Sequence, residues 1–215
     1  MDENRSEPPL TVDGSLAVID AERSRVERRV HFNPSILWAI WAVAWFIGFG
    51  CAYLAYGPKR VIPAWTGPTV AAILLASAFV ASIAYAMRID RGISGPSRTS
   101  AAMYGWTWTL GFVCLSATNI LLGRDLNEKS TVLLWSASTL LLAGVLQLAG
   151  AALYRDRMQY ATGVWTMLCA TGAVTAGVPG NFLVQAIAGG GGFALMAAYF
   201  ALRSSRSDRL RRRSA

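Results

Sequence analysis

The sequence predicts an all-α fold, a polytopic membrane helix bundle with six transmembrane helices arranged as three two-helix hairpin repeats. Three observations support this. Hydrophobic residues make up 54% of the 215 residues and charged residues only 15%. The charges are confined to short stretches, between apolar runs that are close to the roughly 20 residues a helix needs to cross a bilayer. The motif Trp-x-x-Gly-Phe-x-Cys begins at Trp45 and again at Trp108, and a shortened version begins at Trp165.

The apolar runs divide the chain into a membrane domain over 35–202 and two polar tails. The six helices are expected at 35–56, 69–87, 101–122, 131–154, 159–177 and 181–202. Residues 1–34 form an expected cytoplasmic tail, in which 15–30 has the pattern of an amphipathic helix. Residues 203–215 form an expected basic cytoplasmic tail.

The distribution of basic residues predicts the orientation of the chain. Sixteen of the 20 arginines and lysines fall in the two tails and in the second and fourth loops, and the other four are Lys59, Arg60, Arg124 and Lys129. The positive-inside rule therefore places both termini on the cytoplasmic side of the cell membrane. We interpret the net charge of +8 as a consequence of the orientation of the chain in the membrane, so we expect no nucleic-acid partner. The basic carboxyl tail is instead expected to attract anionic lipid at the bilayer surface.

Small residues predict where helices pack and where the chain turns. Ala44, Gly48 and Ala52 recur every four residues, which permits close approach of a neighbouring helix. The segment 179–181 (Pro-Gly-Asn) predicts a reversal between the last two helices, with Asn181 capping the helix that follows. The four glycines at 189–192 are expected to pack against Trp or Tyr side chains; unwinding of the last helix is the alternative.

The predicted spans carry little chemistry. None of them contains Asp, Glu, Lys, Arg or His, the residue types that usually mark ion pathways and proton relays within membranes. One histidine and three scattered cysteines do not form a typical metal site, and no hydrolase or phosphate-loop motif is present. We therefore predict a protein that is not an enzyme and that needs no cofactor or metal.

Polar and tryptophan side chains on the predicted spans support two functional hypotheses. In the first, they line a cavity for an uncharged or zwitterionic solute in a small permease or channel-like transporter. In the second, they are interhelical hydrogen bonds worth about 0.6 kcal/mol each, and the protein is a non-transporting subunit or scaffold. It would then bind a membrane protein partner or a second copy of itself. The predicted cavity residues are Trp45, Thr107, Trp108, Asn119, Gln147, Trp165, Thr166 and Gln185.

Residue usage also suggests a relationship. Alanine, glycine, valine and tryptophan are abundant, and arginine outnumbers lysine by 18 to 2. In this usage the whole chain resembles the small six-span membrane proteins of high-GC Gram-positive bacteria, which are mostly uncharacterised or assigned as candidate transporters. The resemblance implies a six-helix membrane fold and transfers no functional residue.

Overall fold

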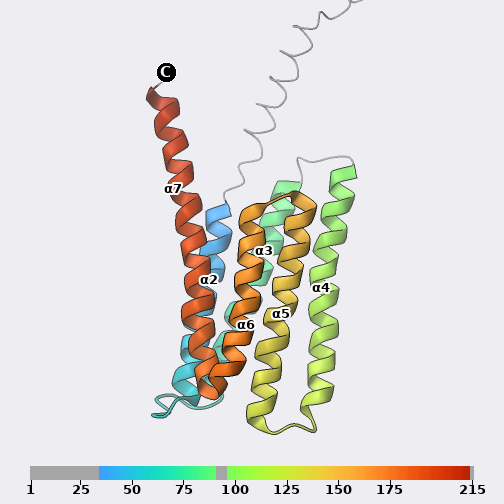
Figure 1. Ribbon diagram of the computed structural model, residues 1–215, viewed down its shortest axis with the longest axis vertical. Coiled ribbons are helices and arrows are strands. Elements are labelled where there is room, and N and C mark those ends of the chain that lie inside the picture. Colours follow the sequence, from blue (N-terminus) through green and yellow to red (C-terminus); the bar gives the residue numbers. More distant parts are fainter. Residues whose placement is uncertain (1–33, 91–95, 214–215) are drawn as a thin grey trace, which may run out of the picture.

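The computed structural model describes residues 34–90 and 96–213, and it is helical throughout these ranges except at the connecting turns (Figure 1). The predicted amphipathic helix over 15–30 lies outside the described residues. The elements are α2 (Pro34–Tyr56), α3 (Thr66–Asp90), α4 (Pro96–Gly123), α5 (Glu128–Tyr154), α6 (Arg157–Val184), η1 (Gln185–Gly190) and α7 (Gly191–Arg213).

Five helical stretches in the described part of the chain are long and apolar enough to cross a membrane. They are Pro34–Tyr56, Thr66–Tyr85, Thr99–Gly123, Glu128–Tyr154 and Arg157–Ser205. The all-α prediction and the helix bundle are thus confirmed. The last stretch has 49 residues, and as one straight helix it would extend about 74 Å, more than twice the roughly 30 Å hydrocarbon core.

This last stretch is interrupted within α6. Gly177 has φ 63° and ψ −179°, and Val178 has φ −86° and ψ 129°, so neither is helical. A positive φ is readily accessible to glycine, and Pro179 next along the chain has no backbone N–H to continue the helical hydrogen bonds. Figure 1 shows α6 and α7 running in opposite directions on either side of this turn. The predicted reversal is confirmed, and it begins at Gly177.

Close packing joins the helices in pairs. A Cβ atom on Gly48 would lie 3.0 Å from the Cα of Ala71, and one on Gly67 would lie 2.6 Å from the Cα of Ala52. These contacts bring α2 and α3 together along the small-residue row, as predicted. Similarly, a Cβ on Gly163 would lie 3.0 Å from the carbonyl oxygen of Gly144, which brings α5 and α6 together.

The hydrophobic core lies between α2, α5, α6 and α7. Trp45 of α2 is its largest side chain, and Trp45 and Phe193 of α7 meet edge to face at 5.0 Å. The remaining buried members are smaller and come from α2, α5 and α6: Ala42, Leu140, Ala170 and Ala173. The alanines around this indole allow α6 and α7 to approach α2 closely.

The glycine run does not unwind the chain. Residues Gln185–Gly190 form a π-helix, which continues directly into α7 at Gly191. A side chain on Gly189 would overlap the indole of Trp45, and one on Gly192 would come within 2.6 Å of the Trp165 indole nitrogen. The prediction that these glycines pack against Trp or Tyr is confirmed for Gly189 and Gly192, whereas Gly190 packs against Phe46 and a Cβ on Gly191 would meet no atom of the described structure within 4 Å.

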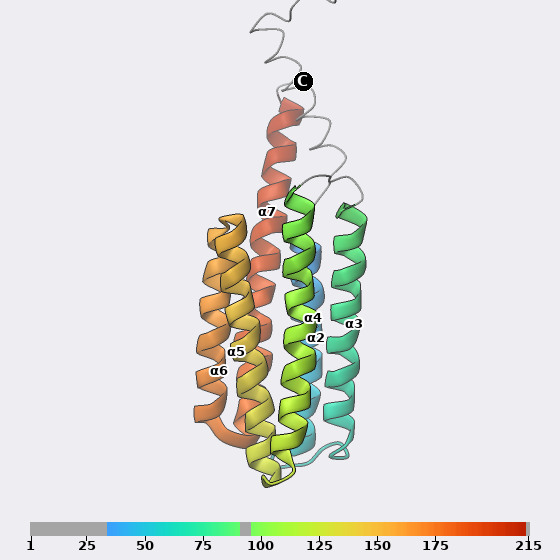
Figure 2. The same ribbon diagram turned by 90° about the vertical axis from the view of Figure 1, so that its right-hand side faces the viewer.

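Helix α4 stands at the edge of the bundle, opposite α7 in the view of Figure 1. Its main packing partner is α5. Figure 2 shows α4 facing the viewer between α5 and α3. Apolar side chains along its outward side are exposed, among them Trp106, Leu110 and Val113.

Candidate functional site

A buried polar cluster lies where the chain reverses. It consists of Ser136 of α5, Asn181 at the end of α6 and Gln185 at the start of η1, and their exposed fractions are 6%, 0% and 1%. The Asn181 side-chain amide donates to Ser136 Oγ at 2.9 Å. Gln185 Nε2 donates to the same oxygen at 3.1 Å and to the Asn181 carbonyl at 3.3 Å. One serine hydroxyl thus links two amide side chains from the returning segment to α5.

The amide oxygen of Asn181 is the unusual atom of this cluster. It is buried and has no hydrogen-bond partner within the described residues. The prediction that Asn181 caps the last helix is therefore wrong, because a cap requires this oxygen to accept a backbone N–H. The side chain turns instead to Ser136 on the neighbouring helix. A buried carbonyl oxygen left unpaired costs about 1–3 kcal/mol, so this oxygen is a natural acceptor for a water or a solute.

Three of the predicted cavity residues converge on η1. Gln185 begins the π-helix, Trp45 packs against Gly189, and the Trp165 indole nitrogen donates to the Ala188 carbonyl at 2.9 Å. Trp45 is buried, and its own indole nitrogen has no partner in the described part of the chain. Trp165 is 45% exposed. Irregular π-helical turns are frequent at functional sites, and here two tryptophans flank one.

The other five predicted cavity residues are dispersed. Thr166 is buried and donates to its own helix at Thr162, and Gln147 is buried with an amide oxygen that has no partner within the described ranges. Asn119 is buried and donates to Ser138 of α5 at 2.8 Å. Thr107 is exposed, and Trp108 stacks on Phe112 along α4. A shared lining role for all eight residues stays a prediction.

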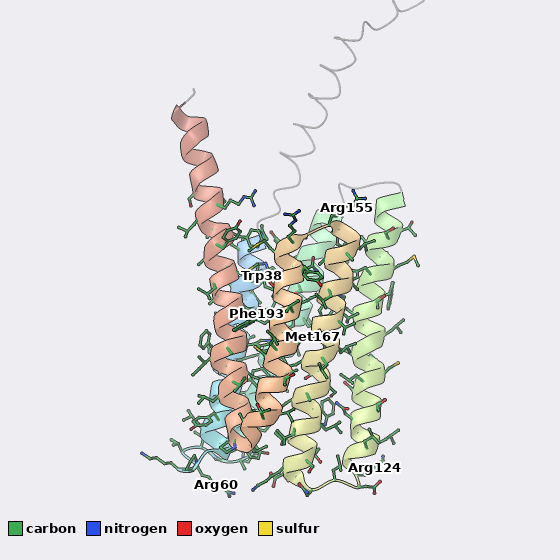
Figure 3. The ribbon with its side chains drawn as sticks, in the orientation of Figure 1. Trp38, Arg60, Arg124, Arg155, Met167 and Phe193 are labelled. Carbon is green, nitrogen blue, oxygen red and sulfur yellow. The ribbon has the colours of Figure 1, made fainter. Side chains whose placement is uncertain are left out.

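A pocket of about 330 Å³ opens beside the polar cluster, at one end of the bundle. Its walls come from the α2–α3 turn, the start of α5 and the chain reversal: Tyr56, Gly57, Pro58, Arg60, Glu128, Lys129, Val132, Val178 and Pro179. Val132 lies one helical turn before Ser136, and Pro179 lies two residues before Asn181. Figure 3 shows Arg60 and Arg124 at this end of the molecule and Arg155 at the opposite end.

The pocket carries charges of both signs. Arg60 and Lys129 contribute positive charge, and Glu128 contributes negative charge. The Glu128 carboxylate interacts with the Tyr56 side chain, whose ring lies 5.5 Å from that of Phe182. Arg60 is held at φ 39°, an uncommon conformation for a residue with a side chain.

Sequence reasoning did not place Ser136, Asn181 or the pocket residues in the site. A signal for the pocket was available, because the loop at 123–129 is the predicted outer segment that contains both charge signs. The signal for Asn181 is its position at the end of the predicted turn at 179–181, where the sequence pattern indicates a helix cap. The contact with Ser136 joins residues 45 positions apart, and no local pattern indicates it.

No family model, curated protein or solved structure matches this chain. The arrangement of the described residues is therefore the basis for a functional assignment. That arrangement consists of an amphoteric pocket at one end of the bundle and, next to it, an incompletely paired amide cluster. Uncharged amides and a hydroxyl can exchange hydrogen bonds with a polar solute without any change of protonation.

Proposed function

We propose that this protein is a six-span permease or channel-like transporter for a small uncharged or zwitterionic solute. The observation that carries the proposal is the fully buried amide oxygen of Asn181, which has no partner within the described residues although the amide nitrogen of the same side chain donates to Ser136. Membrane-buried polar groups usually find partners in neighbouring helices. An oxygen without a partner is better explained as part of a route that a solute occupies in passing.

The proposed topology has six crossings with both termini cytoplasmic. Two features support it: the reversal at Gly177–Pro179, and the positive-inside bias of the loops. Single cysteines at Arg60 and Arg124 should then react with an impermeant maleimide added outside the cell. A cysteine at Arg155 should react only after the membrane is opened. In all three variants the native cysteines are replaced by alanine. Labelling of all three positions from outside would contradict this topology. The three-hairpin repeat stays a prediction; of its corresponding tryptophans, Trp45 is buried and Trp165 is 45% exposed.

The chemistry of the cluster favours uncharged or zwitterionic solutes. A bare ion entering the bundle would meet amides and a hydroxyl, and its desolvation would have no compensating charge there. An alcohol, amide or zwitterion can replace its water contacts with the donors of Asn181 and Gln185 and with the unpaired Asn181 oxygen. We expect no coupling to protons, because the described spans carry no acid or base between their ends.

The proposal is tested by osmotic swelling of proteoliposomes, with glycerol as the uncharged probe and glycine betaine as the zwitterionic probe. Purified protein should accelerate swelling with at least one probe relative to empty vesicles. Asn181→Leu and Gln185→Leu each remove an amide at similar size. Each should slow permeation by about five- to tenfold, the loss expected for one hydrogen bond to the solute.

The matched control is Gln159→Leu, because Gln159 is a half-buried amide whose Nε2 donates to the Tyr104 hydroxyl at 3.3 Å, and neither residue belongs to the cluster. It should leave the permeation rate unchanged. Circular dichroism and gel filtration are used to check that each variant remains folded. Swelling equal to that of empty vesicles with both probes would refute transport, and equal effects of all three variants would remove the cluster from the route.

The alternative function is a non-transporting membrane subunit or scaffold. The observation that favours it is an open groove of about 430 Å³ between α3 and α4, lined mainly by apolar side chains such as Phe79, Phe112 and Ile120. A partner helix could fill this groove. Native mass spectrometry of protein extracted gently from its own membrane distinguishes the two functions, because a subunit would retain a second polypeptide at fixed stoichiometry.

A further inference from the structure

The pocket at the end of the bundle has the composition of a site for a molecule with both charges. Arg60 and Lys129 can hold an anionic group, and they come from two different elements, the α2–α3 turn and α5. Glu128 and the Tyr56 ring can hold a cationic group, by charge attraction and by cation–π contact. Charges of both signs therefore border a single cavity, on side chains of Arg60, Glu128 and Lys129 that are all exposed.

The size of the pocket limits the ligand. At about 30 Å³ for each water-sized group, 330 Å³ accommodates about ten non-hydrogen atoms. That volume is at the lower end of the range for small-molecule sites. A free amino acid or methylammonium acid fits within it, as does the polar end of a zwitterionic phospholipid.

The pocket also adjoins the buried polar cluster. Val132 and Pro179 contribute to its wall, and they precede Ser136 and Asn181 by one turn and by two residues, respectively. A group bound in the pocket thus lies near the segment where the Asn181 amide oxygen has no partner in the described structure. The cluster residues themselves are buried and are not part of the pocket wall.

We propose that this pocket binds a zwitterion in which a quaternary or primary ammonium lies a few bonds from a carboxylate or phosphate. The anionic end contacts Arg60 and Lys129, and the ammonium contacts Glu128 and Tyr56. The inference rests on the proposed function, in that this zwitterion is the solute that the protein carries. A single charge would satisfy only one half of the pocket, so both charges are needed for full affinity.

Binding is measured by isothermal titration calorimetry on the full-length protein in dodecylmaltoside, a non-ionic detergent. The probe is glycine betaine. One comparison compound, 3,3-dimethylbutanoate, has the same shape and carboxylate but a carbon atom in place of the ammonium nitrogen. The other, choline, keeps the ammonium and lacks the carboxylate. We expect glycine betaine to bind at least fivefold more tightly than either.

Charge variants assign each end of the ligand. Glu128→Gln should weaken betaine binding about two- to fivefold, the range for a partly solvated ion pair, and should leave 3,3-dimethylbutanoate unaffected. Arg60→Gln should weaken the binding of both glycine betaine and 3,3-dimethylbutanoate. Asp125→Asn and Arg124→Gln are the matched controls, since both residues are exposed, lie in the same loop region as Glu128 and are not part of the pocket wall. They should leave the dissociation constant unchanged.

Repeating the titration in nanodiscs distinguishes a lipid headgroup from a free solute as the natural ligand. If the natural ligand is free, betaine affinity is the same in phosphatidylglycerol discs with and without phosphatidylcholine. If it is a lipid, phosphatidylcholine competes with betaine; in that case the zwitterion site stands, but free solute is not its cargo. Equal binding of 3,3-dimethylbutanoate and betaine, or no betaine binding at all, overturns the inference. Betaine binding without vesicle swelling would instead overturn the transport function and leave the site intact.

Discussion

Replacing Gly189 with alanine tests the central packing contact of the bundle. A Cβ atom at this position would overlap two ring carbons of Trp45. The Trp45 indole is 6% exposed and meets Phe49 and Phe193 edge to face at 5.2 and 5.0 Å. The ring can therefore yield to the new methyl group only by disturbing two other aromatic contacts.

The magnitude follows from two opposing effects. Alanine is a better helix former than glycine by up to about 1 kcal/mol, whereas overpacking a well-filled core costs about 1–3 kcal/mol. Gly191 provides the matched control, because a Cβ there meets no atom of the described structure within 4 Å. Both glycines lie in one continuous helical segment, so both substitutions gain helix propensity. Gly189→Ala should therefore be less stable than Gly191→Ala by about 1–3 kcal/mol.

The free energy of unfolding is measured in dodecylmaltoside micelles with increasing dodecyl sulfate, followed by far-ultraviolet circular dichroism. A second comparison uses the Trp45→Leu background, in which the smaller side chain leaves room for the methyl group. There the two alanine variants should be equally stable, so the overlap appears as an interaction energy between positions 45 and 189. Equal stability of the two variants in the native background would refute the proposed packing.

Two further substitutions are tested by the same unfolding measurement. Gly67→Ala would place its Cβ 2.6 Å from the Ala52 Cα, a backbone atom that cannot rotate away. It should therefore lower the free energy of unfolding by about 1–3 kcal/mol relative to Gly105→Ala, because a Cβ on Gly105 meets no atom of the described structure within 4 Å. A Gly67→Ala variant as stable as Gly105→Ala would contradict the close α2–α3 contact. Asp156 caps α6 by accepting from the backbone N–H groups of Met158 at 2.8 Å and Gln159 at 3.2 Å. Asp156→Ala should therefore cost about 1 kcal/mol and Asp156→Asn much less, and equal losses would argue against the cap.

The helices were predictable because their causes are local. Each apolar run is long enough to span a bilayer, and helices satisfy their own backbone hydrogen bonds wherever water is excluded. The reversal near Pro179 was also predictable, since proline cannot donate the next helical hydrogen bond. Its exact start at Gly177 was not, because many glycines in this region could adopt the required positive φ.

The candidate site was predicted only in part. Gln185, Trp45 and Trp165 do gather around one π-helical turn, but Thr107 is exposed and Asn119 pairs separately with Ser138. Placing polar residues on one helical face identifies the side that meets another helix. It does not identify which helix is met.

By itself, the sequence determined that the chain is a bundle of long apolar helices with charged ends, because hydropathy, length and charge are properties of contiguous residues. Only the tertiary structure decided that Asn181 and Gln185 share the hydroxyl of Ser136, and that Arg60 and Glu128 border one pocket. These residues are separated by 45 positions or more, and they meet because packing around Trp45 and the glycines of η1 fixes how the helices are arranged.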